Sequence, residues 1–303
     1  MTHHVKSDIY TRVTEKIIAA LEQGERTWVP RWNAAHQAGP VSRPLRQNGI
    51  PYRGMNVLLL WAEAMEKGYA APIWMTFKQA QELGAHVKKG EKGALVVYAN
   101  TVDKTETNEN GEDIERRIAF MRGYTVFNVE QVEGLPQHYY AKPADPLPVT
   151  ERMAAVEDYI TATGADIRHG GDSAYYAPGP DFVQMPQFET FKDREGYYAT
   201  LLHELVHWSG AKGRLDRSFG AKKSDGAKFG NEAYAREELV AELGAAFLCT
   251  DLGITPEVRD DHAPYIASWL EVLKRDKRAI FSAAAHAQRA ADYLGGFRTL
   301  YAS

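Results

Sequence analysis

The chain has almost no cysteine and no long apolar run. Cys249 is the only cysteine among 303 residues, which excludes an intramolecular disulfide and a metal cluster built on cysteine. No segment approaches the roughly 18 apolar residues of a membrane span, and the first residues lack the apolar core of a signal peptide. We therefore expect a cytoplasmic protein with no membrane partner, in which any bound metal uses histidine and carboxylate ligands.

Acidic residues are missing from one part of the chain. Residues 26–62 contain no Asp or Glu, although the whole chain has 40 of them. Guanidinium groups neutralise phosphates and aromatic rings stack on unpaired bases of any identity, so this stretch favours non-specific binding of single-stranded DNA. In the alternative interpretation, the tryptophans belong to the core and the arginines only solvate the surface. The residues predicted to bind DNA are Arg26, Trp28, Arg31, Trp32, Arg43, Arg46, Tyr52, Arg53, Lys88 and Lys89.

The charge is unevenly distributed along the chain. Residues 1–100 hold 13 Lys and Arg against 8 Asp and Glu, and the remainder holds 23 against 32. Prolines crowd together in residues 134–149 and predict a linker, with a boundary near Asp145. We expect a DNA-binding domain over residues 1–140 and a second domain over residues 150–303, each able to bury its own core.

Hydrophobic periodicity predicts an α+β fold. Asp8 is the expected N-cap of the first helix. In the first domain we expect helices over residues 8–23, 56–66 and 76–83, and strands over 94–100 and 118–129 joined by a polar loop over 101–117. In the second we expect helices over 150–163, 232–251 and 264–294, and short strands over 174–176 and 181–185.

Residues 201–210 read LLHELVHWSG and contain the pattern H-E-x-x-H. On a helix, His203 and His207 lie one above the other and can bind a single ion. Glu204 lies beside His203, where it can act as a base on a water bound to that ion without being a ligand. The flanking apolar residues would bury the helix, and Gly210 would end it.

A catalytic zinc needs a third protein ligand. A longer version of the pattern has a third histidine at a position that Gly213 occupies here, so the ligand must lie elsewhere. On the next predicted helix, Glu238 and Glu242 are four residues apart, as are the ligand and its supporting acid in zinc proteases with a glutamate ligand. We predict Glu238 as third ligand and Glu242 as the residue that orients a histidine. His262 is the alternative, as ligand or as stabiliser of an oxyanion, and Glu237 is a further candidate ligand, although Ala241 follows it at the same distance.

Small residues surround this pair of glutamates, among them Ala241, Gly244 and Ala245, and would let the two helices approach closely. Zn²⁺ suits such a site, although Mn²⁺ or another divalent ion is also accepted by histidine and carboxylate ligands. Peptide hydrolysis is the natural reaction, with residues 181–186 either as a strand to which an extended peptide could add or as a plain core strand. The alternative is that both patterns are charged helix faces and bind no metal.

A basic, aromatic-rich first domain joined to a zincin-like second domain resembles the ArdC family of antirestriction proteins. The resemblance implies an N-terminal domain that binds single-stranded DNA, a C-terminal metallopeptidase fold, and protection of incoming plasmid DNA from restriction. It carries the metal site onto His203, Glu204 and His207, and onto Glu238. The segments that resemble the family are DIYTRVTEKIIAALEQG, WNAAHQAGPVSRPLRQNGIPYRGMNVLLLW, HELVHWSG, EELVAELGAAFL and WLEVLKRDKRAIFSAAAHAQRAADYL.

Three hypotheses follow from the sequence. The first is a DNA-binding protective protein with an accessory zincin domain. The second is an active protease that acts on a DNA-associated or restriction protein, and the third is a DNA-coating protein with a vestigial metal site. Glu204 argues against the vestigial site, because a purely structural site has no use for a base at that position.

Overall fold

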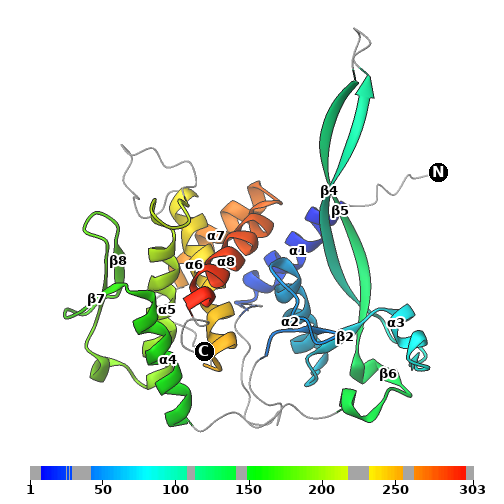
Figure 1. Cartoon of the computed structure of the whole chain (residues 1–303), viewed down its shortest axis with the longest axis horizontal. Coiled ribbons are helices and arrows are strands. Elements are labelled where there is room, and N and C mark those ends of the chain that lie inside the picture. The colour runs from blue at the N-terminus through cyan, green and yellow to red at the C-terminus, as the bar shows by residue number, and fades with distance from the viewer. Residues whose placement is uncertain are drawn as a thin grey trace.

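The computed structural model describes residues 8–24, 26, 28, 42–107, 113–140, 149–217, 232–254 and 263–297. We call the described residues up to Tyr140 the front half and those from Val149 onward the back half. The front half combines helices with a long two-stranded ribbon, and the back half is mainly helical (Figure 1). The predicted α+β class with two domains is confirmed. The proposed boundary near Asp145 lies outside the described residues.

The front half begins with an amphipathic helix, α1, at Ile9–Glu22. Asp8 caps it, as predicted, by accepting a hydrogen bond from the backbone N–H of Tyr10 at 2.6 Å. Its further elements are β1 (Leu45–Arg46), α2 (Met55–Lys67), β2 (Ile73–Met75), α3 (Phe77–Glu82), β3 (His86–Val87), β4 (Ala94–Thr107), β5 (Asp113–Asn128) and β6 (Val132–Glu133), with two 3-10 turns at Val129–Gln131 and Gln137–Tyr140.

Strands β4 and β5 form an antiparallel ribbon that reaches far beyond the helices (Figure 1); we call it the arm. It belongs to a sheet with the strand order β1-β2-β5-β4. The predicted polar loop over 101–117 is wrong for its described residues, because the ladder continues to the pair Thr107↔Asp113. Threonine and other β-branched residues favour strands, and the polar composition of this part of the arm reflects exposure on both faces.

The back half contains α4 (Val149–Thr163), β7 (Asp166–His169), β8 (Tyr175–Ala177), β9 (Phe182–Met185), a 3-10 turn (Phe188–Thr190), α5 (Arg194–Ser209), α6 (Glu232–Leu252), α7 (Ala263–Arg275) and α8 (Ala279–Gly295). The small sheet has the order β7-β9-β8, so β9 is paired on both sides. The expectation that residues 181–186 accept a peptide as an added strand is therefore wrong, because a central strand has no free edge.

The single helix predicted over 264–294 is two helices, because the chain turns between α7 and α8. Asp276 holds this turn: its carboxylate accepts from the backbone N–H of Arg278 at 2.9 Å, and its carbonyl accepts from Ala279 N at 3.1 Å. An acid that bonds nearby backbone N–H groups is a frequent way to start a new helix. Hydrophobic periodicity continues through such a break, so it does not reveal the turn.

The main hydrophobic cluster contains residues of both halves. Trp28 of the front half packs edge to face on Trp269 of α7 with ring centroids 5.9 Å apart, and Trp61 of α2 contacts Phe247 of α6 at 5.9 Å. The halves therefore share a core, where the sequence predicted a separate core for each. A second, smaller cluster of the front half surrounds Met75. Among the described residues, no helix combines the length and apolarity of a membrane span.

Candidate functional site

Helix α5 carries the H-E-x-x-H pattern inside the back half. Asp193 caps its start by accepting from Gly196 N at 2.8 Å, and Gly210 is its C-cap, as predicted. The helix packs on α6 without room for a larger residue at Gly244, since a Cβ there would lie 2.8 Å from the side chain of Val206. The small residue therefore does what the sequence suggested and lets the two helices approach closely.

The close approach brings three predicted residues together. His203, His207 and Glu238 each offer a ligand atom, and these atoms all lie within 4.8 Å of one another. The Nε2 atoms of the two histidines are 3.2 Å apart, and the carboxylate of Glu238 lies 3.4 Å from His203 Nε2 and 3.6 Å from His207 Nε2. Two imidazoles and one carboxylate are the donor set of a catalytic zinc with an open position. The residues present therefore fit a divalent cation.

Each of the two histidines has a further glutamate at its other ring nitrogen. Glu242, predicted to orient a histidine, has its Oε2 3.8 Å from His203 Nδ1, which is within ion-pair range but longer than a hydrogen bond. Glu237 Oε1 lies 3.1 Å from His207 Nδ1, a contact that the sequence did not suggest. Carboxylates at this position orient a metal-binding imidazole.

The charges of the cluster are coupled. Burial alone would lower the pKa of His207, but its interactions with Glu237 and Glu238 outweigh burial and raise that pKa to about 10. Burial would raise the pKa of Glu238, but His203 and His207 hold it well below its usual range. Burial opposes ionisation of Glu237 as well, and the guanidinium of Arg217 lowers its pKa. An anionic Glu238 between imidazoles suits a cation.

Glu204, the predicted base, is 4% exposed on the buried face of α5. Its neighbour in the sequence, the candidate ligand His203, is also 4% exposed. His262, the alternative ligand, lies outside the described residues. Tyr234, one turn before Glu238 on α6, is a further neighbour: its hydroxyl lies 3.2 Å from that of Tyr265, and burial and this hydrogen bond raise its pKa.

Several residues predicted to bind DNA lie between the two halves and connect them. Trp28 is 0% exposed and Tyr52 is 8% exposed, so neither ring presents a face on which a base could stack. Arg43 is buried and holds both carboxylate oxygens of Asp251 at 2.9 and 2.8 Å. The acid-free stretch therefore has a second explanation, because its basic residues meet acids of the back half.

The other predicted DNA-binding residues have different positions. Arg26 is paired with Glu242 at 3.1 Å, and Arg53 is exposed and paired with Asp292. Arg46 lies on the surface over the ring of Tyr52, and Lys88 and Lys89 are exposed at the turn before the arm. Arg31 and Trp32 lie outside the described residues.

The arm presents an aromatic and basic surface that the sequence did not suggest. Along an antiparallel ribbon, alternate cross-strand pairs share one face. Tyr98, Phe120, Arg122 and Tyr124 share such a face, which we call the arm face. Tyr98 lies 6.2 Å from Phe120 and 6.3 Å from Tyr124 between ring centroids, and the guanidinium of Arg122 lies 5.4 Å from the ring of Phe120. Tyr98 and Tyr124 are 48% and 46% exposed.

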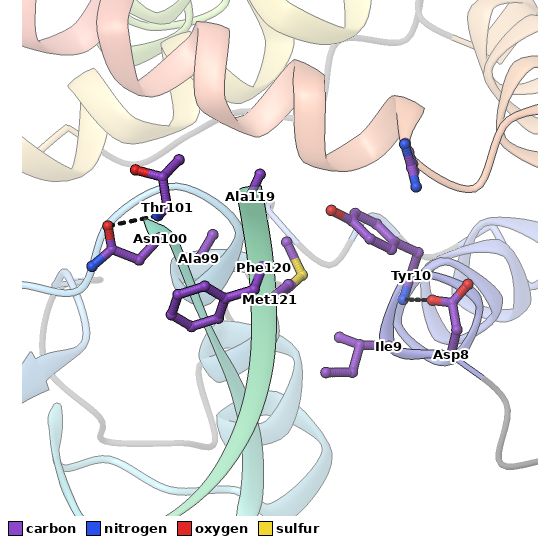
Figure 2. Close-up of a pocket in the computed structure, with 10 residues that line it drawn as sticks. Asp8, Ile9, Tyr10, Ala99, Asn100, Thr101, Ala119, Phe120 and Met121 are labelled. Atoms are coloured by element: carbon purple, nitrogen blue, oxygen red, sulfur yellow. Dashed lines mark hydrogen bonds between the residues drawn. The ribbon is translucent and has the colours of Figure 1, made fainter. Parts of the chain in front are cut away.

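A pocket of about 630 Å³ opens beside the arm, between α1 and the start of α8 (Figure 2). Phe120 and Met121 of β5 line it on one side, and Tyr10 of α1 lines it on the other. Arg278 belongs to the lining as well, with its guanidinium 4.9 Å from the Tyr10 ring. The pocket thus has apolar walls, one cation from Arg278 and one carboxylate from Asp8, and both halves contribute to it.

The geometry defines the back half as a metallopeptidase-like domain with an H-E-x-x-H helix and a glutamate from the next helix. Residues 154–286 match the family described as "Zincin-like metallopeptidase", and residues 7–127 match the one described as "N-terminal domain of anti-restriction factor ArdC". The chain belongs to the ArdC family of antirestriction proteins. The resemblance found in the sequence is confirmed.

Solved structures and further relatives agree with this assignment. The crystal structure of the antirestriction protein ArdC from the R388 plasmid, in its metal-free form, has a TM-score of 0.80 and 43% identity, covering 98% of this chain and 100% of that chain. Its Mn(II)-bound form has a TM-score of 0.78 and 42% identity, covering 97% and 99%.

The chain is also similar to two curated proteins that differ greatly in length from each other. Protein y4eC of Sinorhizobium fredii is 47% identical over 299 residues, which cover 97% of this chain and 93% of that protein. A DNA primase TraC of Escherichia coli is 36% identical over 313 residues, which cover 97% of this chain but 27% of the primase.

Proposed function

We propose that the protein protects incoming DNA of a mobile element from host restriction in the cytoplasm, by binding it as a single strand without sequence preference. The back half holds a divalent cation at His203, His207 and Glu238. The observation that carries the metal assignment is the grouping of these three ligand atoms within 4.8 Å. The observation that carries DNA binding is the exposed arm face. The Mn(II)-bound ArdC structure supports a divalent cation, and Zn²⁺ also suits these ligands.

The arm face has the chemistry that single-stranded DNA requires. Three rings lie on one side of the ribbon with a guanidinium among them, and rings of this kind stack on bases of any identity. The pocket beside Phe120 has room for an unpaired base, and Arg278 offers a positive charge to its phosphate. Arg46, Lys88 and Lys89 are exposed and extend the positive charge around the front half.

Fluorescence anisotropy with a short oligothymidine tests this surface. Replacing Tyr98 and Tyr124 with Ala should weaken binding by about tenfold for each ring, because stacking on a base contributes about 1–3 kcal/mol. Arg122→Gln should reduce the slope of log affinity against log salt by about 0.7, the value for one phosphate contact to a single strand. Tyr175→Ala is the matched control, since Tyr175 is 48% exposed but lies in the back half on β8. Wild-type affinity in the double arm variant would refute the assignment.

Metal titration tests the back half. Glu238→Ala should lower the affinity for Zn²⁺ or Mn²⁺ by more than about a hundredfold, because removing a ligand costs more than removing a residue that only orients one. The arm should be unaffected, so this variant should bind oligothymidine as the wild type does. Unchanged metal affinity would show that Glu238 is not the third ligand.

The alternative function is peptide hydrolysis, and the H-E-x-x-H pattern favours it, because Glu204 follows the candidate ligand His203 on α5 and is 4% exposed. A bound divalent ion would acidify a water and polarise a carbonyl. Glu204 would accept the proton. A restriction-protection assay with Glu204→Gln separates the two functions: loss of protection with intact metal and DNA binding would make proteolysis the protective activity, whereas full protection would leave the arm responsible.

A further inference from the structure

We infer that Arg26 is a positioning residue of the metal centre, which the front half supplies to the back half. Arg26 Nη1 lies 3.1 Å from Glu242 Oε1, and Glu242 Oε2 lies 3.8 Å from His203 Nδ1. The two oxygens of one carboxylate thus face a guanidinium on one side and an imidazole on the other. The inference rests on the proposed metal site and adds that its affinity depends on the other half of the molecule.

His207 also has a glutamate at its Nδ1 atom and an arginine behind that glutamate, but here both residues belong to the back half. Glu237 contacts His207 at 3.1 Å, and Arg217 donates to Glu237 Oε2 at 2.8 Å from its Nε and to Oε1 from its Nη2. Arg217 also donates to the carbonyl of Val206 at 2.7 Å, which ties it to α5 itself. Each histidine therefore has a glutamate and an arginine behind it, and for His203 the arginine comes from the front half.

Burial explains why the guanidinium matters. The side chains of Arg26 and Glu242 are 7% and 8% exposed. A buried carboxylate that loses its charged partner also loses the contact that fixes its direction, since little water is present to replace it. A carboxylate that is no longer fixed would restrain the His203 imidazole less well, and its Nε2 would then be a weaker ligand for a divalent cation.

Packing fixes Arg26 in turn. Two residues further along, Trp28 is 0% exposed and packs on Trp269 of α7. This contact joins Trp28 of the front half to the back half. The position of the guanidinium is therefore set by the shared core of the two halves.

Arg43 provides a matched control. It also belongs to the front half and binds a carboxylate of α6, that of Asp251, and its side chain is 9% exposed. Asp251 lies nine residues beyond Glu242, near the end of α6, and the candidate ligands are elsewhere on the helix pair. Loss of Arg43 therefore weakens the contact between the halves without removing a support of a histidine.

Metal titration of full-length variants tests the inference. Arg26→Met should lower the affinity for Zn²⁺ or Mn²⁺ by about ten- to hundredfold, the range for residues that orient a metal ligand. Arg26→Lys keeps the charge without the planar guanidinium and should lose less. Arg43→Met should keep the metal affinity within about twofold while lowering the thermal stability of the metal-free protein.

A double-mutant cycle shows whether Arg26 acts through Glu242. In a Glu242→Gln background, Arg26→Lys and Arg26→Met should have little further effect on metal affinity, because coupled residues are not additive. Equal metal affinity of the wild type and both Arg26 variants, or full additivity with Glu242→Gln, would overturn the inference. If Arg26→Met does not fold, the cycle with Arg26→Lys decides. A wild type that binds no metal would instead overturn the proposed metal site.

Discussion

The helix pair α5–α6 and the arm β4–β5 place their candidate functional residues in opposite surroundings. On the helix pair, His203 and Glu238 are 4% and 7% exposed and their positions depend on how closely two helices pack. On the arm, Tyr98 and Tyr124 are 48% and 46% exposed, and their positions depend on the ladder between two strands. A site of the first kind is sensitive to packing and to protons, whereas a surface of the second kind is sensitive to the loss of its own side chains.

The strongest test of this difference is pH. The raised pKa of His207, about 10, means that this histidine holds a proton at neutral pH when no metal is bound. A metal must displace that proton, so metal affinity should rise about tenfold for each pH unit, or about a hundredfold from roughly pH 6 to 8. The arm has no histidine between residues 94 and 128, so the affinity for oligothymidine should change little at constant ionic strength. Titrations of metal and of DNA across this range measure both.

The raised pKa of His207 also makes the stability of the metal-free protein depend on pH, but this stability falls as the pH rises, whereas metal affinity increases. Because the folded state raises the pKa of His207 from 6.5 to about 10, the folded state binds the proton more tightly than the unfolded state. This contribution to stability is complete below the unfolded pKa and is lost as the pH rises toward 10. Metal-free protein should therefore become easier to unfold with rising pH while its metal affinity increases. A metal affinity independent of pH would show that His207 is neutral before the ion binds.

The cluster of candidate ligands could be predicted from the sequence because helix geometry converts spacing into position. His203 and His207 are four apart, and so are Glu238 and Glu242, which fixes the face of each helix that they share. Their supports could not all be predicted, because nothing in the spacing places Arg26 or Arg217 near a helix that lies elsewhere in the chain. Contacts of this kind are set by the packing of the halves.

The arm and the interface show why the front half was harder to predict. Alternation of arginine and aromatic residues between 26 and 62 favours a nucleic-acid surface, but the same residue types also build an interface with an acidic partner, and the structure places Arg43 and Trp28 there. In the arm, the polar residues after Asn100 are typical of a loop, although they extend the ladder to Thr107. A polar composition indicates that residues are exposed to solvent. It does not distinguish a loop from a two-stranded ribbon that is exposed on both faces.

We expect Gly244→Ala, on the helix pair, to change stability and metal affinity by less than the pH change does. The added Cβ would meet Val206 at 2.8 Å, so α5 and α6 would have to move apart. Overpacking of this kind costs about 1–3 kcal/mol, and it would also shift Glu238 away from the histidines. Thermal unfolding should show the loss of stability, and metal titration should show weaker binding. Ala245→Gly, in the adjacent position, is a control that adds no volume; equal metal affinity in Gly244→Ala and wild type would show that the helices tolerate the separation.

We expect the smallest change in stability from replacing two exposed apolar residues of the arm. Val102 and Ile118 are opposite each other in the ladder and are 51% and 37% exposed. Replacing both with Thr keeps β-branched side chains and removes only a cross-strand apolar contact, so stability should fall by about 0.2–1 kcal/mol. Denaturant unfolding measures this change, and metal affinity should remain that of the wild type because the arm supplies none of the three candidate ligands. A loss of metal binding in this variant would show that the arm and the helix pair are energetically coupled, and the contrast between them would then fail.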